Sequence, residues 1–365
     1  MAAADVTPSA GKARERKDGA AIPLDDFDKA LLNRMQGRFP IVERPYAEVA
    51  AALEVDEARV LRRVQELIDH RIIRQVTPIF DTRALGYASM LVAAKVDPEV
   101  PWRPAKIVNA HPGVSHNYLR NHDFNMWFTI AVEPGSRLGL EGTLDVLQRL
   151  TGAESVRMLP TLKLFKIRMD LELAGGTDAL AAPVAAAVEP AETEPQPYDD
   201  LDVAVIRATQ GDLPVVPEPY ADAAREVGLP TARLVEHLEG MVERRLLRRV
   251  AAILFHRRAG FSANGMGVWK VPEDRVLEVG AQMATFRGVS HCYQRPTYPD
   301  WPYQLFTMAH GRSKEECDAI LDAVGEHAGC VEDRATLYSS TEFKKVRLQY
   351  FTGEFEAWER EHAGA

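Results

Sequence analysis

The sequence predicts an α+β fold in which a winged helix-turn-helix and a βαββαβ ferredoxin-like domain form a tandem duplication. Two pairs of segments predict the duplication. Residues 25–47 and 199–221 share eleven identical positions, including the final Pro-Tyr-Ala. The segment GVSHNYLR at 113–120 returns as GVSHCYQR at 288–295. Because matches of this length point to an internal repeat, we expect the two halves to fold alike.

The first part of each copy is predicted to hold three short helices. In the first copy, apolar residues recur at helical spacing within 31–35, 49–53 and 60–68. Asp56 precedes the third of these segments and is a candidate N-cap. The extended segment 72–80 follows. This order is typical of a winged helix-turn-helix.

The second part of each copy is predicted to be a ferredoxin-like domain. The expected elements of the first copy, in order, are strand 87–96, helix 103–110, strand 114–120, strand 125–132, helix 138–150 and strand 155–168. The two middle strands turn at the sequence Asn-His-Asp at 121–123. The second copy repeats the order between residues 261 and 350.

Composition divides the chain further. A segment between the copies is rich in Ala, Pro, Glu and Gly, which predicts a linker with too little apolar surface to fold. The predicted units are a disordered tail 1–23, a winged helix-turn-helix 24–80, a ferredoxin-like domain 81–173, the linker 174–197, a winged helix-turn-helix 198–254, a ferredoxin-like domain 255–352 and a C-terminal tail 353–365.

Charge and cysteine content exclude several classes of protein. The chain has 365 residues, 44 basic and 53 acidic, and a net charge of −9, which argues against a polycation that coats nucleic acid. Its three cysteines form no CxxC pair, so we expect a reducing cytoplasm. No apolar run approaches the roughly 20 residues of a membrane span, and residues 1–23 have no apolar core of a signal peptide.

The candidate site is one face of the repeated GVSHxYxR strand. A strand period of two places Val114, His116, Tyr118 and Arg120 on the same side, and Cys292 of the second copy on the opposite side. The matching residues of the second copy are Val289, His291, Tyr293 and Arg295. A wide ligand with several carboxylates would suit this face, because Arg binds carboxylates bidentately and His can give a proton near neutral pH. A wet sheet surface is the structural alternative, but the repetition favours a function.

The order of domains resembles the Lrp/AsnC family of transcription factors. Such a resemblance implies that the third helix enters the major groove of DNA. In the second copy, however, this helix carries Glu236, Glu239 and Glu243 at helical spacing on one face. Carboxylates on that face would be repelled by phosphates, so we expect no nucleic-acid binding by the second copy.

Longer motifs carry a narrower resemblance. GVSHNYLRNHDFNMWFT and GVSHCYQRPTYPDWPYQLFTMAHG resemble the two subunit types of siroheme decarboxylase, here fused, and IIRQVTPIFDTRALGY fits the same family. The resemblance implies non-oxidative removal of the acetate carboxyl groups at carbons 12 and 18 of siroheme, which gives 12,18-didecarboxysiroheme in haem biosynthesis. It implies no required cofactor and no protein-bound metal, since the iron belongs to the substrate.

Residue chemistry then suggests roles in that reaction. His116 and His291 are candidate proton donors or carboxylate partners, supported by Tyr118 and Tyr293. Arg120 and Arg295 are candidate carboxylate clamps. Further candidate substrate-binding cations are Lys163, Lys166, Arg168, Lys345 and Arg347, although lysines on an edge strand also discourage aggregation.

An aromatic group in the second copy leaves two interpretations open. Trp301 and Tyr303, with Tyr298, either cover a bound macrocycle as a loop lid or pack at a seam between the copies.

The sequence also leaves the assembly and two other functions open. We expect the copies to pair through their sheets as an intramolecular pseudo-dimer, and a homodimer of the whole chain is also compatible with the linker. A DNA-binding regulator of the Lrp/AsnC type and a siroheme- or haem-binding sensor are the alternative functions.

Overall fold

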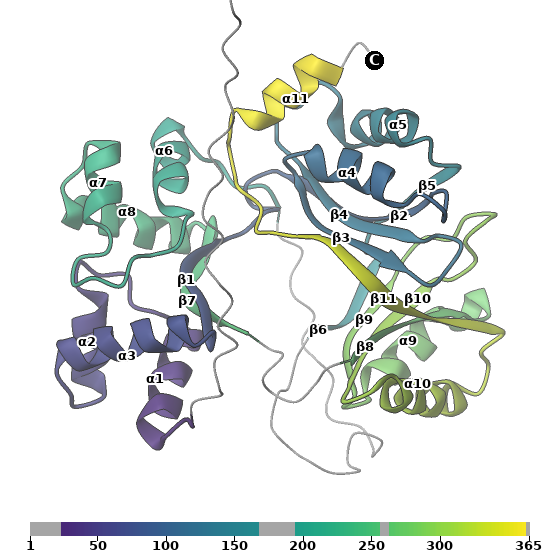
Figure 1. Cartoon of the computed structure of the whole chain (residues 1–365), viewed down its shortest axis with the longest axis horizontal. Coiled ribbons are helices and arrows are strands. Elements are labelled where there is room, and N and C mark those ends of the chain that lie inside the picture. The colour runs from purple at the N-terminus through teal and green to yellow at the C-terminus, as the bar shows by residue number, and fades with distance from the viewer. Residues whose placement is uncertain (1–22, 168–193, 256–262, 363–365) are drawn as a thin grey trace, which may run out of the picture.

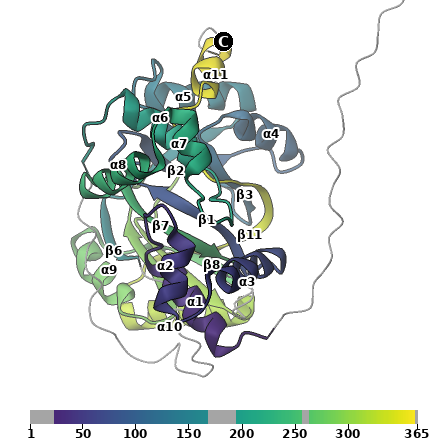
Figure 2. The ribbon, with the colours of Figure 1, turned by 90° about the vertical axis from the view of Figure 1, so that its left-hand side faces the viewer.

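The computed structural model describes residues 23–167, 194–255 and 263–362. The predicted N-terminal tail and most of the predicted linker therefore lie outside the described residues. Figures 1 and 2 show the two helix-turn-helix domains together on one side of the molecule and the large sheet with its covering helices on the other. No helix in these ranges is long and apolar enough to cross a bilayer.

Each helix-turn-helix domain begins with an aspartate capping box. The helices of the first copy are α1 (Asp26–Gly37), α2 (Pro45–Ala52) and α3 (Glu57–Asp69), and those of the second are α6 (Asp200–Thr209), α7 (Ala221–Val227) and α8 (Thr231–Glu243). Asp25 and Asp199 cap α1 and α6 through their side chains. Asp56 occupies the N-cap position of α3 as predicted, but its side chain makes no capping hydrogen bond.

A buried aspartate ties the first helix of each domain to the third. Asp28 is fully buried and receives two hydrogen bonds from the Arg63 guanidinium at 2.6 and 2.7 Å. The counterpart Asp202 is bound in the same way by Arg244. The arginine of α3 is therefore used inside the domain, because an unpaired carboxylate in the core would be costly.

The extended segments that follow the helices pair with each other. β1 (Ile73–Phe80) and β7 (Leu247–Leu254) form an antiparallel two-stranded sheet. The wings of the two copies are thus joined into one ribbon, and a single apolar core includes residues of both domains.

The ferredoxin-like halves merge into one nine-stranded sheet. Its order is β5-β2-β4-β3-β11-β8-β10-β9-β6. The strands are β2 (Ala88–Lys95), β3 (Val114–Arg120), β4 (Met126–Val132), β5 (Ser155–Leu159), β6 (Lys163–Ile167), β8 (Ala263–Lys270), β9 (Val289–Gln294), β10 (Leu305–Gly311) and β11 (Asp333–Lys345). The helices are α4 (Trp102–Ala110), α5 (Gly139–Thr151), the 3-10 turn η3 (Glu273–Arg275), α9 (Val276–Ala284), α10 (Lys314–Ala328) and α11 (Glu354–His362).

The two copies exchange their final strands. The single strand predicted over 155–168 is wrong: β5 pairs with β2 of its own copy, and after a break β6 pairs with β9 of the other copy. In the second copy β11 is continuous, and it pairs first with β8 and then with β3. Each GVSHxYxR strand therefore lies beside the last strand of the other copy.

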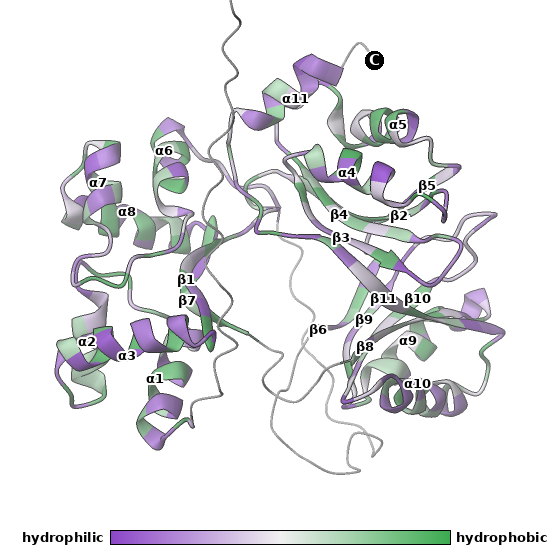
Figure 3. Cartoon of the chain, in the orientation of Figure 1, coloured by the Kyte–Doolittle hydropathy of each residue, from purple (hydrophilic) through white to green (hydrophobic). Residues whose placement is uncertain are grey.

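The faces of the sheet that the helices leave uncovered pack together in a cluster that we call the seam cluster. Its buried members come from both copies: Ala93, Phe124, Trp127, Leu159, Met266, Val268, Trp301, Tyr303, Phe306 and Leu337. Separate apolar clusters lie between each half-sheet and its own helices. Figure 3 shows hydrophobic colouring along parts of the strands, while the covering helices carry both hydrophobic and hydrophilic residues.

The expectation of a C-terminal tail at 353–365 is wrong for most of that segment. Residues 354–362 form α11, which buries Phe355 and Trp358. Both rings meet the ring of His111, which is itself buried after α4 of the first copy. The tail prediction failed because two apolar side chains suffice to fold a short amphipathic helix once a surface is present to receive them.

Replacing Trp301 tests the seam cluster. Trp301 has 0% exposure and contacts Trp127, Phe124 and Tyr303 edge-on. Trp301→Ala should lower the free energy of unfolding by about 3–5 kcal/mol, because the cavity removes packing from both copies. Urea unfolding followed by circular dichroism measures this. Trp102→Ala is the control, since Trp102 is 63% exposed, and should cost about 1 kcal/mol or less. Equal losses would contradict the seam cluster.

His111 should make stability fall in acid. Burial, together with the positive charges of Lys344 and His362, lowers the pKa of His111 to about 3. Below about pH 6.5 the His111 imidazole binds a proton in the unfolded chain but not in the folded chain. The free energy of unfolding therefore falls by up to about 1.4 kcal/mol per pH unit. His111→Asn keeps an acceptor for the backbone N–H of Gly113 and should flatten the loss of stability between pH 6.5 and 4. An unchanged slope in urea titrations would refute this origin.

Candidate functional site

The GVSHxYxR segments lie on β3 and β9, one in each copy. Their first residue is glycine for a steric reason: a Cβ on Gly113 would collide with the carbonyl oxygen of Ala131 on β4. In the first copy the chain is thus held close to β4 at the start of the motif, whereas in the second copy a Cβ on Gly288 would meet the Ile320 side chain of α10.

His, Tyr and Arg of each motif share one face, but the prediction that the valine shares it is wrong. Val114 belongs to the core under the helices of its own copy, whereas Arg120 lies over the Trp127 ring of the seam cluster. The register of β3 shifts between Val114 and His116, which is the mark of a β-bulge. One extra residue reverses the alternation, so the valine turns to the helices and the histidine to the seam. Val289 likewise packs in the helix-side core of the second copy.

Histidine and tyrosine stack in the same way in both copies. The ring centroids of His116 and Tyr118 are 6.2 Å apart at an interplanar angle of 28°. Those of His291 and Tyr293 are 6.0 Å apart at 23°. Burial lowers the pKa of both histidines, so both rings favour the neutral form.

Each motif arginine is held by the other copy. The Arg120 Nη1 donates a hydrogen bond to the carbonyl oxygen of Leu337 on β11, and the Arg295 Nη1 donates one to that of Leu159 on β5. The Nε of each guanidinium is buried with no hydrogen-bond partner among the described residues. Burial lowers the pKa of each arginine to about 10.

No carboxylate of the described chain forms an ion pair with either guanidinium. A buried cation with an unused donor is unstable until an anion reaches it. The two arginines therefore fit the terminal carboxylates of an anionic ligand.

The surroundings of the two histidines differ in charge. Lys345 on β11 pairs with His116 in the sheet register, and the positive charges of Lys345 and Arg74 further lower the pKa of His116. Glu342 acts in the opposite direction. For His291, burial is the cause of the lowered pKa. The first copy thus offers extra positive charge beside its histidine.

Cys292 lies on the side of β9 that faces away from the site, as the strand period predicted. Its thiol lies on the helix side of β9, where Sγ donates to the carbonyl oxygen of Gly280 at 3.4 Å. Burial raises the pKa of this thiol, which keeps it protonated.

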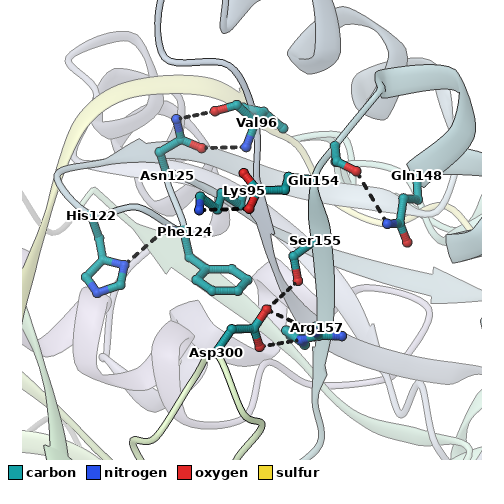
Figure 4. A network of polar contacts seen from close by, with 11 residues as sticks. Lys95, Val96, His122, Phe124, Asn125, Gln148, Glu154, Ser155, Arg157 and Asp300 are labelled. Atoms are coloured by element: carbon teal, nitrogen blue, oxygen red, sulfur yellow. Dashed lines mark hydrogen bonds and ion pairs between the residues drawn. The ribbon is translucent and has the colours of Figure 1, made fainter.

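Trp301 and Tyr303 pack at the seam, the second of the two interpretations that the sequence allowed. Trp301 is enclosed by the seam cluster, and the Tyr303 hydroxyl donates to Asp333 Oδ2 at 2.9 Å. Nearby, Asp300 binds Ser155 and Arg157 of β5, as Figure 4 shows. Their assignment to substrate binding is therefore corrected: this loop fastens the second copy to the first.

Arg347 is also placed elsewhere than predicted. Its guanidinium donates to Thr77 Oγ1 and to the carbonyl oxygen of Pro78, both on β1. Arg347 therefore joins the segment after β11 to the paired wings, because its half-buried guanidinium finds its acceptors there.

The lysines of β6 lie toward the helices. Lys166 Nζ donates to the carbonyl oxygen of Phe286 at 2.6 Å, and Lys163 lies over the ring of Phe165, which packs against Gly280 of α9. Both side chains thus lie on the helix side of the sheet, away from the His–Tyr–Arg face, and the register of β6 shifts between them, between Leu164 and Lys166. Their role in substrate binding stays a prediction. Arg168 lies outside the described residues.

Sequence reasoning missed two groups near the motif. Arg74 comes from β1 of a helix-turn-helix domain, which the sequence assigned to a separate unit. His310 on β10 contacts Ser290, the neighbour of His291. Its only signal in the sequence was that the first copy has valine at the matching position.

Comparisons with known proteins follow the same division of the chain. The family described as AsnC-like ligand binding domain matches residues 84–166 and 258–344. The siroheme decarboxylase NirDL-like HTH domain matches residues 28–74 and 202–248. A siroheme decarboxylase of Hydrogenobacter thermophilus is 39% identical, over 92% of this chain and 98% of its own.

The chain belongs to the siroheme decarboxylase family.

Two further relatives of this family bear on the architecture. The alpha subunit of siroheme decarboxylase from Desulfovibrio desulfuricans is 41% identical over 45% of this chain and 92% of its own length, so one subunit matches about half of the duplicated chain. A crystal structure of the siroheme decarboxylase NirDL in co-complex with an iron-uroporphyrin III analogue has a TM-score of 0.73 and 34% identity, and the match covers 93% of this chain and 99% of that one.

Proposed function

We propose that this siroheme decarboxylase removes the acetate carboxyl groups at carbons 12 and 18 of siroheme and releases 12,18-didecarboxysiroheme for haem biosynthesis. One observation carries the proposal. Two partly buried His–Tyr–Arg faces each present a buried guanidinium Nε without a partner among the described residues. A tetrapyrrole that bears carboxylates on several sides supplies the missing anions.

The reaction is a replacement of CO2 by a proton. The bond between the methylene carbon and the carboxylate breaks, its electron pair stays on the methylene carbon and spreads into the macrocycle, and a proton then bonds to that carbon. No electrons enter or leave, so the balance needs no oxidant or reductant. We therefore propose that the protein contributes no cofactor or metal of its own and that the iron arrives with the substrate.

The residues divide into anion binding and proton donation. Arg120 and Arg295 clamp substrate carboxylates, and Lys345 adds positive charge beside His116. His116 and His291 supply or guide the proton, and the stacked Tyr118 and Tyr293 hold the imidazoles in place. Preorganised charges of this kind favour the transition state because they need no rearrangement during the reaction.

We propose no nucleic-acid partner and a cytoplasmic location. The two wings pair with each other through β1 and β7, and Arg63 of α3 is engaged by Asp28. Free cysteine thiols fit a reducing compartment. The exchanged final strands support an intramolecular pseudo-dimer as the working unit.

Anaerobic incubation with siroheme tests the function. The purified protein should release a tetrapyrrole that has lost two carboxyl groups as CO2, detected by mass spectrometry. His116→Ala combined with His291→Ala should lower turnover by about a hundredfold or more, because no placed acid remains. His327→Ala is the control, since His327 is exposed on α10. Unchanged siroheme with the wild-type protein would refute the function; full turnover by the double variant would refute the histidine roles.

The arginines should govern affinity more than turnover. Arg120→Met and Arg295→Met remove a charge-assisted contact and should each weaken binding of iron-uroporphyrin III about 10- to 100-fold in absorbance titrations. Arg334→Met is the matched control, because Arg334 lies on β11 but pairs with Asp322 of α10. Circular dichroism checks that each variant is folded. Equal affinity for all four proteins would show that the arginines act only between the copies.

A further inference from the structure

A chain of polar contacts leads away from His291 in the second copy. The Ser290 hydroxyl lies 2.8 Å from His291 Nδ1 and 2.6 Å from His310 Nε2. His310 Nδ1 in turn lies 2.6 Å from Asn264 Oδ1. Ser290 is buried, His310 is half-buried and Asn264 is exposed, so the chain runs from the site toward solvent.

The first copy lacks this chain beyond its serine. Ser115 Oγ lies 3.0 Å from His116 Nδ1, as in the second copy. The sheet register, however, pairs Val132 with Ala88 where the second copy pairs His310 with Asn264. Two apolar side chains cannot carry a proton. The second copy therefore has a polar route by which a proton could reach its histidine, at a point where the first copy has apolar side chains.

The groups around His310 come from the two strands that flank β10 and from Gly288, directly before β9. Asn264 belongs to β8, Ser290 to β9, and the backbone N–H of His310 donates to the carbonyl oxygen of Gly288 at 3.4 Å. The Ser290 hydroxyl also lies 3.3 Å from the carbonyl oxygen of Met308. The Asn264 carbonyl oxygen accepts from Nδ1–H, which leaves Nε2 of His310 to face the serine.

We propose that His310 is a positioning residue that supplies the proton of decarboxylation to His291 through Ser290. The inference rests on the proposed function and deepens it. It assigns proton donation to the second copy, while the first copy, with Lys345 and Arg74 near His116, binds substrate carboxylate. The asymmetry suits a reaction that uses one proton for each CO2 released.

The transfer balances at every atom. A protonated His310 gives its Nε2 proton to Ser290 Oγ, the serine gives its own proton to His291 Nδ1, and His291 gives its Nε2 proton to the methylene carbon. His310 ends neutral, with Nδ1–H still donating to Asn264. His291, whose burial disfavours a charge on the ring, passes the proton on without having to hold the cation.

His310→Gln tests the relay. With siroheme under anaerobic conditions, kcat should fall about tenfold or more while KM changes little, because substrate contacts are retained. The solvent deuterium isotope effect on kcat should rise, and added imidazole should restore part of the rate. His327→Gln is the matched control and should behave as wild type in all three measurements.

The possible results separate a failure of the proposed function from a failure of the relay. If wild-type protein leaves siroheme unchanged, the proposed function fails and the relay fails with it. If wild-type protein turns over and His310→Gln keeps its kcat, the relay alone is wrong. A loss of kcat in folded His310→Gln that imidazole does not restore, with an unchanged isotope effect, means that His310 has only a structural role and also overturns the inference.

Discussion

The exchange of final strands is the constraint on which the rest of this structure depends. β6 of the first copy completes the sheet beside β9, and β11 of the second copy completes it beside β3. The residue that holds each motif arginine, Leu337 or Leu159, comes from the opposite copy. Neither half can therefore present its His–Tyr–Arg face alone, which explains why the copies stay covalently linked or must associate.

The seam cluster packs the two copies firmly against each other, so that the exchanged strands form one rigid frame. Large aromatic side chains from both copies fill it, and the loop that precedes β10 is fastened to β5 through Asp300. Against this apolar background the cost of the buried guanidinium groups of Arg120 and Arg295 is high, and an anionic ligand offsets it. Stability of the frame and affinity for a carboxylated substrate are thus linked through the same two residues.

Divergence of the copies has given them complementary chemistry. The first copy gathers positive charge around His116 from β11 and from the wing strand β1. The second copy places His310 and Asn264 where the first has Val132 and Ala88. A single repeated sequence in a symmetric dimer would have to combine both environments at each site, whereas a fused pair can separate them.

The sequence by itself determined the duplication, the order of domains and the identity of the His–Tyr–Arg face, because repeats, capping residues and strand period are local signals. The tertiary structure alone decided the bulge that turns Val114 away, the split of the 155–168 strand and the helix at 354–362. It also decided that Trp301 fills the seam and that Arg347 binds β1. Those outcomes depend on which distant strand or ring lies opposite each residue, and no local pattern encodes that partner.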